Sequence, residues 1–325
     1  MEKTPVSASD IEVLAVAKLS PLLAEPLTAA YTVHERLHET DPQAFAAVAP
    51  RIRAIAASGE SKVDAALIAK LPALEIISVM GVGYDGIDVA AAKARGVVVT
   101  HTPGVLNDDV ADLALALMLA VSRTIPQADR HVREGRWESS GPMPLARKMS
   151  GARLGLVGMG RIGQAIAQRA LAFRMEVAYT ARSPKSELSY KYFPTPQALA
   201  AESDFLVVIT PGGAGTRKLI DASVFKALGP QGSVINVARG SVIDEAALIE
   251  ALEQGVIGSA GLDVFEDEPR VPARLKALPN VVLTPHIGSA TVSTRQAMAD
   301  LAFANLRAHF AGEPLPSPVP ECREA

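Results

Sequence analysis

Three side chains in the second half of the chain have the types needed to bind a small acid and move a proton. Arg239, Glu268 and His286 each follow an apolar, strand-like run. A guanidinium holds a carboxylate through two parallel hydrogen bonds. An imidazole exchanges a proton near neutral pH, and a neighbouring carboxylate raises its pKa. Taken singly, these residues are ordinary surface, turn and loop residues, but reduction of a carbonyl compound would need a proton donor, a cation and a group that tunes the donor, and they are candidates for these tasks.

A glycine-rich pattern within residues 152–183 predicts a dinucleotide site. An apolar run at 154–157 precedes three glycines spaced G-x-G-x-x-G, and a helical pattern and a second strand-like run follow. The first glycine allows a tight turn, the second lets the backbone approach a pyrophosphate, and the third lets the helix pack against the strand. N–H groups at the helix start would face the phosphates. We expect contacts from Gly158, Met159, Gly160, Arg161, Ile162 and Gly163.

The end of the second strand of this unit favours a phosphorylated dinucleotide. An NAD site usually places Asp or Glu there to accept hydrogen bonds from the ribose 2′-hydroxyl. This chain has Ala181, Arg182 and Ser183 instead. Arg182 and Ser183 can bind a 2′-phosphate. An ordinary solvated basic loop would have the same composition, but the missing carboxylate favours NADP(H), with NAD(H) as the alternative.

Length and composition restrict the class of protein. The chain has 325 residues, 49% of them hydrophobic, and a formal net charge of −3, which favours one large or two medium globular domains over a nucleic-acid-binding protein. Cys322 is the only cysteine, which excludes a disulfide framework and a cysteine metal site within one chain. No metal is expected. No signal-like segment is seen, and the longest apolar run, 113–121, is too short to span a bilayer. We therefore expect a cytoplasmic protein without membrane contact.

Alternating strand-like and helix-like segments predict an α/β fold with two parallel-sheet domains. Residues 1–102 form most of the first domain and 103–289 form the second. The last predicted helix, 292–310, returns to the first, so that residues 290–325 complete it. The two crossings would form a hinge beside a cleft between the domains.

One helix and the segment after it are unusually apolar. The helix is predicted over residues 109–123, capped by Asn107 or Asp108, and is apolar on nearly every side. Such a helix is expected to be buried all round, between domains or in a dimer. The less regular segment 125–149 carries the only tryptophan, Trp137. Core packing is the preferred interpretation of Trp137, with contact to substrate or a partner subunit as alternatives.

The chain resembles the D-2-hydroxyacid dehydrogenase family over almost its full length. The segments that carry the resemblance are GVGYDGID, THTPGV, GLVGMGRIG, INVARGSVIDEAAL, GLDVFEDEP and TPHIGSAT. The segments YTARS and NLRAHF are similar to the NADPH-using glyoxylate, hydroxypyruvate and hydroxyphenylpyruvate reductases within the family. The resemblance implies a flavodoxin-like substrate domain (1–102 plus 290–325), a Rossmann NADP-binding domain (103–289), and a homodimer to which residues 109–149 contribute.

The resemblance also implies a role for each candidate residue. His286 would transfer the proton and Glu268 would hydrogen-bond to it. Arg239 would bind the carboxylate and carbonyl of a small 2-oxo acid. Backbone N–H groups of Val82 and Gly83, after the strand-like run 74–79, would hold the other side of the carboxylate.

Further cofactor contacts are implied at the strand ends. Asp263 would orient the nicotinamide carboxamide. The loop 210–215 is richer in glycine than is usual in the family. His101 is interpreted as a packing residue rather than one that lines the cleft. The remaining expected contacts come from Thr210, Pro211, Val237, Ala238, Arg239, His286 and Gly288.

The predicted activity is NADPH-dependent reduction of a 2-oxo acid to the D-2-hydroxy acid. An NAD-using member of the same family and a dinucleotide-sensing corepressor on the same fold are the alternatives. Glu268 argues against formate dehydrogenase, whose histidine pairs with Gln, and a phosphoglycerate dehydrogenase would usually carry a further regulatory domain. The substrate stays open among glyoxylate, hydroxypyruvate, arylpyruvates and sugar-derived 2-oxo acids, as do the direction of the reaction and the strictness of the NADPH preference.

Overall fold

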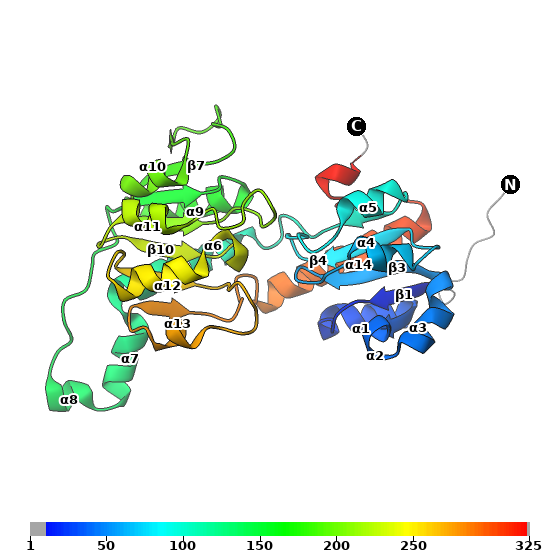
Figure 1. Ribbon diagram of the computed structural model, residues 1–325, viewed down its shortest axis with the longest axis horizontal. Coiled ribbons are helices and arrows are strands. Elements are labelled where there is room, and N and C mark those ends of the chain that lie inside the picture. The colour runs from blue at the N-terminus through cyan, green and yellow to red at the C-terminus, as the bar shows by residue number, and fades with distance from the viewer. Residues whose placement is uncertain (1–10, 324–325) are drawn as a thin grey trace. The chain divides into compact units, whose positions relative to one another are not determined.

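The computed structural model describes residues 11–323, which fall into two compact units (Figure 1). The second unit is Asn107–Ala290, and the first consists of the segments before and after it. The sequence predicted the domain boundaries after residues 102 and 289. In the structure the boundaries between the two units fall after residues 106 and 290. Each unit has its own hydrophobic core.

The first unit is built on a five-stranded parallel sheet in the order β2-β1-β3-β4-β5. This is the order of flavodoxin-like sheets, as predicted. Its strands are β1 (Glu12–Ala15), β2 (Thr32–Glu35), β3 (Ile52–Ser58), β4 (Ile76–Met80) and β5 (Val98–Thr100). Its helices are α1 (Pro21–Ala30), α2 (Leu37–Thr40), α3 (Pro42–Val48), α4 (Ala65–Ala69), α5 (Val89–Ala94) and α14 (Val292–Ala311).

Short-range chemistry explains where several of these helices begin. The carboxylates of Asp41, Asp64 and Asp88 each accept a hydrogen bond from a backbone N–H in the first turn of α3, α4 and α5. Such caps satisfy donors that have no partner within the helix. The returning helix α14 packs on β4, where the buried Ser78 hydroxyl donates to the carbonyl of Ala302 at 2.9 Å.

The second unit is built on a seven-stranded parallel sheet in the order β12-β11-β10-β9-β6-β7-β8. Read from the other edge, this is the Rossmann order 3-2-1-4-5-6 with one further strand. The strands are β6 (Arg153–Val157), β7 (Glu176–Thr180), β8 (Lys191–Tyr192), β9 (Phe205–Val208), β10 (Ser233–Asn236), β11 (Ser259–Leu262) and β12 (Val281–Leu283). The helices are α6 (Asn107–Arg123), α7 (Ile125–Arg133), α8 (Arg136–Ser140), α9 (Arg161–Ala172), α10 (Pro196–Ala201), α11 (Ala222–Leu228), α12 (Glu245–Glu253) and α13 (Ala273–Ala277).

The apolar helix α6 is buried on one broad face rather than all round. Leu117 on this face lies so close to β11 that a Cβ on Gly261 would sit 3.1 Å from the Leu117 Cβ. On the opposite side Asp112 and Ala116 are exposed. The expected capping residue is also wrong, because the helix already begins at Asn107 and contains both candidates.

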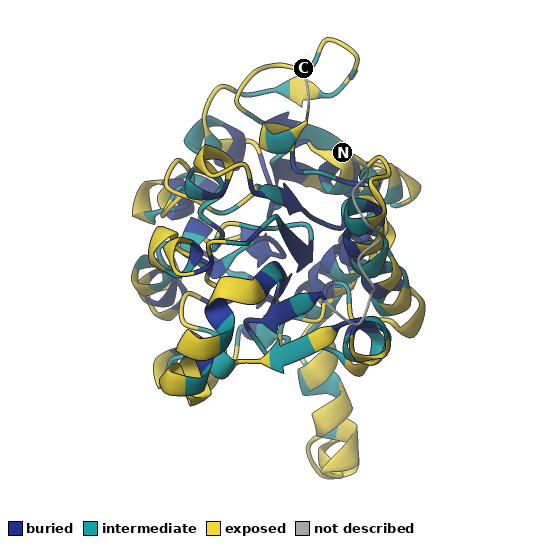
Figure 2. Ribbon diagram, turned by 90° about the vertical axis from the view of Figure 1, so that its right-hand side faces the viewer, coloured by how far each residue is buried: buried dark blue, intermediate teal, exposed yellow. Residues whose placement is uncertain are grey.

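Residues 125–149, here named the arm, project from the second unit (Figures 1 and 2). The sequence predicted an irregular segment, whereas the structure has α7 and α8 followed by an extended stretch. Trp137 is 63% exposed, so the prediction that it packs in a core is wrong. Ile125, Val132 and Leu145 are also exposed. The arm therefore buries little apolar surface within its own chain.

The last described residues run along the edge of the first sheet. Pro318 pairs with Thr100 in an antiparallel bridge, and the N–H of Val319 donates to Val99 at 3.0 Å. A single 3₁₀ turn, Pro320–Cys322, ends the described chain, so the tail is extended only in part. Within residues 11–323, no helix combines the length and the apolar character needed to cross a membrane.

Candidate active site

The glycine turn between β6 and α9 has the geometry that the sequence predicted. Gly158 has φ 108°, and a Cβ there would lie 2.6 Å from the carbonyl oxygen of Ile209. A Cβ on Gly163 would lie 2.5 Å from the carbonyl oxygen of Gly158, so α9 packs directly on the turn. A Cβ on Gly160 would meet nothing within 4 Å. The middle glycine therefore leaves open space at the start of α9, where an anion is favoured.

Arg161 adds a positive side chain to this helix start. It is exposed and occupies the first position of α9. A cation is unfavourable there by itself, because the helix dipole is positive at that end. A bound diphosphate would reverse the sign of the interaction and favour both the helix start and Arg161.

Two tyrosines hold the loop after β7, which carries Arg182. The buried hydroxyl of Tyr179 accepts a hydrogen bond from the backbone N–H of Lys185 at 2.7 Å. The Tyr192 hydroxyl donates to the carbonyl of Ala181 at 3.4 Å, and the two rings pack edge to face. Arg182 is exposed and forms no ion pair with another residue in the range 11–323. The loop is thus fixed at both ends with its guanidinium open to solvent.

The turn that carries Arg239 is shaped by Asn236, a residue to which the sequence assigned no role. Asn236 is buried, accepts a hydrogen bond from the N–H of Ala238 at 3.1 Å, and donates to the carbonyl of Arg239 at 3.0 Å. A Cβ on Gly240 would lie 1.9 Å from the carbonyl oxygen of Phe265. The Arg239 turn therefore lies directly against the loop that leads to Glu268.

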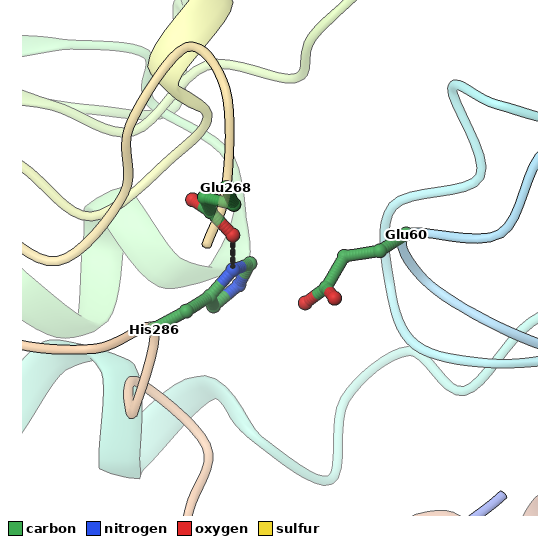
Figure 3. A group of neighbouring side chains, drawn as sticks. All are labelled: Glu60, Glu268 and His286. Carbon is green, nitrogen blue, oxygen red and sulfur yellow. Dashed lines mark hydrogen bonds and ion pairs between the residues drawn. The ribbon is translucent and has the colours of Figure 1, made fainter. Parts of the chain in front are cut away.

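Glu268 and His286 form the ion pair that the sequence predicted (Figure 3). His286 Nδ1 lies 2.7 Å from Glu268 Oε2, and the other carboxylate oxygen accepts the N–H of Phe265 at 2.9 Å. Burial alone would raise the pKa of Glu268. The hydrogen bonds and the charges of His286 and Arg239 outweigh burial, and the net pKa shift is downward. Glu268 is therefore a carboxylate at neutral pH, and Nδ1 of His286 carries the proton between them. Glu60, also drawn in Figure 3, belongs to the first unit.

The backbone at His286 is held in an uncommon conformation. Its φ is 52°, in the left-handed region that costs non-glycine residues about 1–3 kcal/mol. Asp263 supplies the constraint. Its carboxylate accepts hydrogen bonds from the Thr284 hydroxyl at 2.6 Å and from the N–H groups of Ile287 and Gly288 at 2.8 Å each. The N–H of His286 donates to the Asp263 carbonyl at 2.8 Å.

These contacts give Asp263 a role that the sequence did not predict. It was expected to orient the nicotinamide carboxamide, but three hydrogen bonds already bind its carboxylate to the loop 284–288. Burial raises the pKa of Asp263, and the three donors offset part of that effect. A carboxylate offers about four lone-pair sites, so one remains for a further donor. Asp263 therefore positions His286, whatever else it binds.

The other candidates are distributed between the two units. Val82 and Gly83 follow β4 in the first unit, whereas Arg239, Glu268 and His286 all belong to the second. In the loop after β9, the Thr216 hydroxyl donates to the carbonyl of Pro211 at 2.7 Å and closes the glycine-rich segment into a turn. The remaining expected cofactor contacts, Thr210, Val237, Ala238 and Gly288, also lie at the carboxyl ends of strands of the second sheet.

A Rossmann sheet, a glycine turn that opens a helix, and a histidine–carboxylate pair at the strand ends define a dinucleotide-dependent oxidoreductase. A family model described as D-isomer specific 2-hydroxyacid dehydrogenase, NAD binding domain, matches residues 115–288. The chain belongs to this family.

Relatives with assigned activities support the same family over nearly the whole chain. A glyoxylate/hydroxypyruvate reductase of Arabidopsis thaliana is 50% identical over 268 residues, 82% of this chain and 85% of the relative. A hydroxyphenylpyruvate reductase of Plectranthus scutellarioides is 46% identical over 95% of this chain and 99% of the relative. The crystal structure of an NADPH-dependent glyoxylate/hydroxypyruvate reductase from Sinorhizobium meliloti, in complex with NADP and malonate, is 45% identical, with a TM-score of 0.90 over 98% of this chain and 100% of that one.

Proposed function

We propose that this protein reduces a small 2-oxo acid of the glyoxylate or hydroxypyruvate type to the D-2-hydroxy acid with NADPH. The observation that carries the proposal is the His286–Glu268 pair at 2.7 Å, with Arg239 on the adjacent turn. The names of the relatives support this substrate class. The first unit would serve as the substrate domain and the second as the NADP-binding domain.

Each residue would have one task in the reduction. Bound NADPH would supply the hydride for the carbonyl carbon. Arg239 binds the substrate carboxylate and carbonyl through its guanidinium, and the N–H groups of Val82 and Gly83 bind the other side of the carboxylate. His286 gives the proton at Nε2 to the carbonyl oxygen, because Nδ1 is engaged with Glu268. The Glu268 carboxylate stabilises the imidazolium before transfer.

The preference for NADPH would arise at the end of β7. Arg182 would pair with the 2′-phosphate and Ser183 would donate a hydrogen bond to it. No carboxylate stands at 180–183 to bind a free 2′-hydroxyl. Gly160 and Arg161 would hold the diphosphate. The cofactor site would be completed by Ala181, Thr210, Pro211, Val237, Ala238 and Gly288. Asp263 would use its remaining lone pair for the nicotinamide carboxamide.

The protein would act as a homodimer through the arm and α6. Ile125, Val132 and Trp137 are at least half exposed and Leu145 is fully exposed. Apolar side chains gathered on one projecting segment are typical of an interaction surface. A second copy of the chain would cover them, and α6 would contribute the open side that carries Ala116.

The test is steady-state oxidation of NADPH by a panel of glyoxylate, hydroxypyruvate, an arylpyruvate and 2-ketogluconate. We expect turnover with one or more of these acids. His286→Ala should lose about a hundredfold to ten-thousandfold in kcat, the usual contribution of proton donation, while NADPH still binds. A wild type that binds NADPH but reduces none of the acids would indicate a dinucleotide sensor instead.

A further inference from the structure

The loop after β4, residues 81–84, has two successive carbonyl groups fixed from one side. The carbonyl oxygen of Gly81 accepts a hydrogen bond from the N–H of Thr102 at 2.8 Å. The carbonyl oxygen of Val82 lies 3.0 Å from His101 Nδ1. A carbonyl only accepts, so His101 carries a proton on Nδ1 and donates it. The segment 101–102 therefore holds both carbonyls.

Because each peptide is planar, the two fixed carbonyls also determine the orientation of two N–H groups. The Gly81 carbonyl shares a planar trans peptide with the N–H of Val82, and the Val82 carbonyl shares one with the N–H of Gly83. In a trans peptide the C=O and N–H point in opposite directions. Both N–H groups are therefore directed away from residues 101–102. Among residues 11–323, neither N–H donates to a backbone or side-chain acceptor. Successive N–H groups on one side of the backbone form an anion-binding concavity.

His101 can impose this orientation because it is itself held firmly. It is 7% exposed. Its N–H donates to the carbonyl of Ser317 at 3.1 Å, and its carbonyl accepts the Ser317 hydroxyl at 2.6 Å. Asn305 on α14 in turn binds Ser317 through both its amide oxygen and its amide nitrogen. The His101 ring also packs edge to face on Tyr84.

The loop is confined from a second direction as well. A Cβ on Gly81 would lie 2.8 Å from the Cα of Gly59, so the two backbones are in direct contact. The Tyr84 hydroxyl donates to Glu321 in the C-terminal tail at 3.0 Å. These contacts limit translation of the loop. Among the described residues only Thr102 and His101 bind the two carbonyls, so they set the rotation of the two peptides.

We propose that His101 is a positioning residue that aims the N–H groups of Val82 and Gly83 at the substrate carboxylate. The sequence favoured packing over lining the cleft for this side chain. The inference rests on the proposed function, because it takes the carboxylate of a 2-oxo acid as the anion. His101 acts through the Val82 carbonyl and does not itself touch the substrate.

The test compares two substitutions that differ in one donor. His101→Leu fills the space without a hydrogen bond to Val82. In His101→Asn the amide nitrogen stands the same number of bonds from Cα as Nδ1 and can replace its hydrogen bond. We expect the KM for glyoxylate to rise about tenfold in His101→Leu, near the upper end for one neutral hydrogen bond, and to stay within about threefold of wild type in His101→Asn. The kcat and the Kd for NADPH should change by no more than about twofold in either variant, because Arg239, Glu268 and His286 are intact.

Binding of malonate to the NADPH complex, measured by calorimetry, gives a readout independent of turnover. Its Kd should rise in His101→Leu in parallel with the KM and recover in His101→Asn. Tyr84→Phe is the matched control, since it removes the hydrogen bond to Glu321 and leaves both carbonyl contacts. It should leave the KM and the malonate Kd within about twofold of wild type.

The outcomes separate the two claims. An unchanged KM and malonate Kd in His101→Leu, or equal losses in His101→Leu and Tyr84→Phe, would overturn the positioning role and leave the reductase proposal intact. A wild type that binds malonate without reducing any 2-oxo acid would overturn the proposed function, while the malonate series would still decide the role of His101. A wild type that neither reduces nor binds these acids would overturn both.

Discussion

At the scale of single residues, the charge on Glu268 is the feature with the clearest consequence for the chemistry. Its pKa is lowered against the effect of burial by the hydrogen bonds from His286 and Phe265 and by the nearby positive charges. The carboxylate therefore remains ionised well below neutral pH. An imidazole that must donate a proton benefits from such a partner, because the negative charge favours its protonated form.

Glu268→Gln should move the pH profile of reduction toward acid. With His286 as the proposed proton donor, reduction would need the imidazolium, so its rate should fall as pH rises through the pKa of that imidazole. Removing the negative charge should lower that pKa, and the decline should begin at lower pH in the variant. The measurement is kcat/KM for glyoxylate reduction as a function of pH. The series runs from about pH 5 to about pH 9, which covers the range in which histidines titrate. Glu266→Gln is the control, because Glu266 lies in the same loop but pairs with Arg217. A profile that shifts equally in both variants, or in neither, would contradict the pairing.

Asp263→Asn should weaken the loop that carries His286. The amide nitrogen would face the Thr284 hydroxyl and the N–H of Ile287, or the N–H of Gly288, and leave a buried donor unsatisfied. Such a loss costs about 1–3 kcal/mol. We expect a lower midpoint of urea unfolding of the second unit and a reduced kcat.

Asp221→Asn makes the same chemical change at the cap of α11, where Asn is as good as Asp. It should leave the midpoint nearly unchanged. If Asp263→Asn were equally harmless, the hydrogen bonds of Asp263 would not be what holds His286 in its strained conformation.

The sequence placed the segments of Glu268 and His286 after strands of one parallel sheet, and the family resemblance implied that the two residues pair, as the structure shows. It could not predict the tasks of Asn236 and Asp263. Their hydrogen bonds depend on the path of the loops after β10 and β12, and no local pattern specifies that path. His101 was predicted to pack, and its contact with the Val82 carbonyl depends on how the chain folds, which no local pattern specifies.

At the scale of elements, the strand β7 and its loop couple a buried tyrosine to an exposed arginine. Tyr179 lies in the core and binds the backbone of Lys185, so the position of the Arg182 turn is set from inside the sheet. This reduces the conformational freedom that the loop, proposed to bind the 2′-phosphate, would lose on binding the cofactor.

Arg182→Ala should weaken NADPH binding about tenfold or more, because a hydrogen bond to a charged group contributes roughly 1.5–3 kcal/mol. NADH binding should barely change, since its 2′-hydroxyl carries no charge. Both Kd values are measured by titration. Lys185→Ala removes the same charge nearby, from a side chain that lies 3.6 Å from Glu187, and should have a much smaller effect. Equal losses for NADPH and NADH would mean that Arg182 supports the loop rather than binding the phosphate.

Elements that bury a regular apolar face were predicted well, and those that do not were missed. The strands β4, β6 and β9 and the helix α9 have such faces, and their positions match the sequence pattern, whereas β8 has no buried residue and was not predicted. The helices α7 and α8 have no fully buried residue, so no core stripe marks them in the sequence. Trp137 was misplaced for a related reason. Large apolar side chains are usually buried, but this general rule does not apply to a segment that projects from its domain.

At the scale of the whole molecule, two sheet orders follow from one alternating pattern. Right-handed crossovers and parallel pairing leave few arrangements for such a chain, which is why the fold class could be predicted. The surface of the second unit is not explained by this alternating pattern. Its arm exposes apolar side chains that the single chain leaves uncovered, and such a group of side chains is typical of an interaction surface.

Sedimentation at micromolar concentration should show a homodimer, and Leu145→Asp should shift it toward monomer. Leu145 is fully exposed in the single chain, and a charge placed in an apolar interface would remain desolvated without a partner. Leu171→Asp is the matched control, because Leu171 is also exposed but lies on α9 outside the arm. Trp137 is the only tryptophan, so its emission should shift to the red in the monomeric variant as it loses its cover. A wild type that sediments as a monomer, or a Leu145→Asp variant that stays dimeric with unchanged emission, would exclude the arm as the dimer interface.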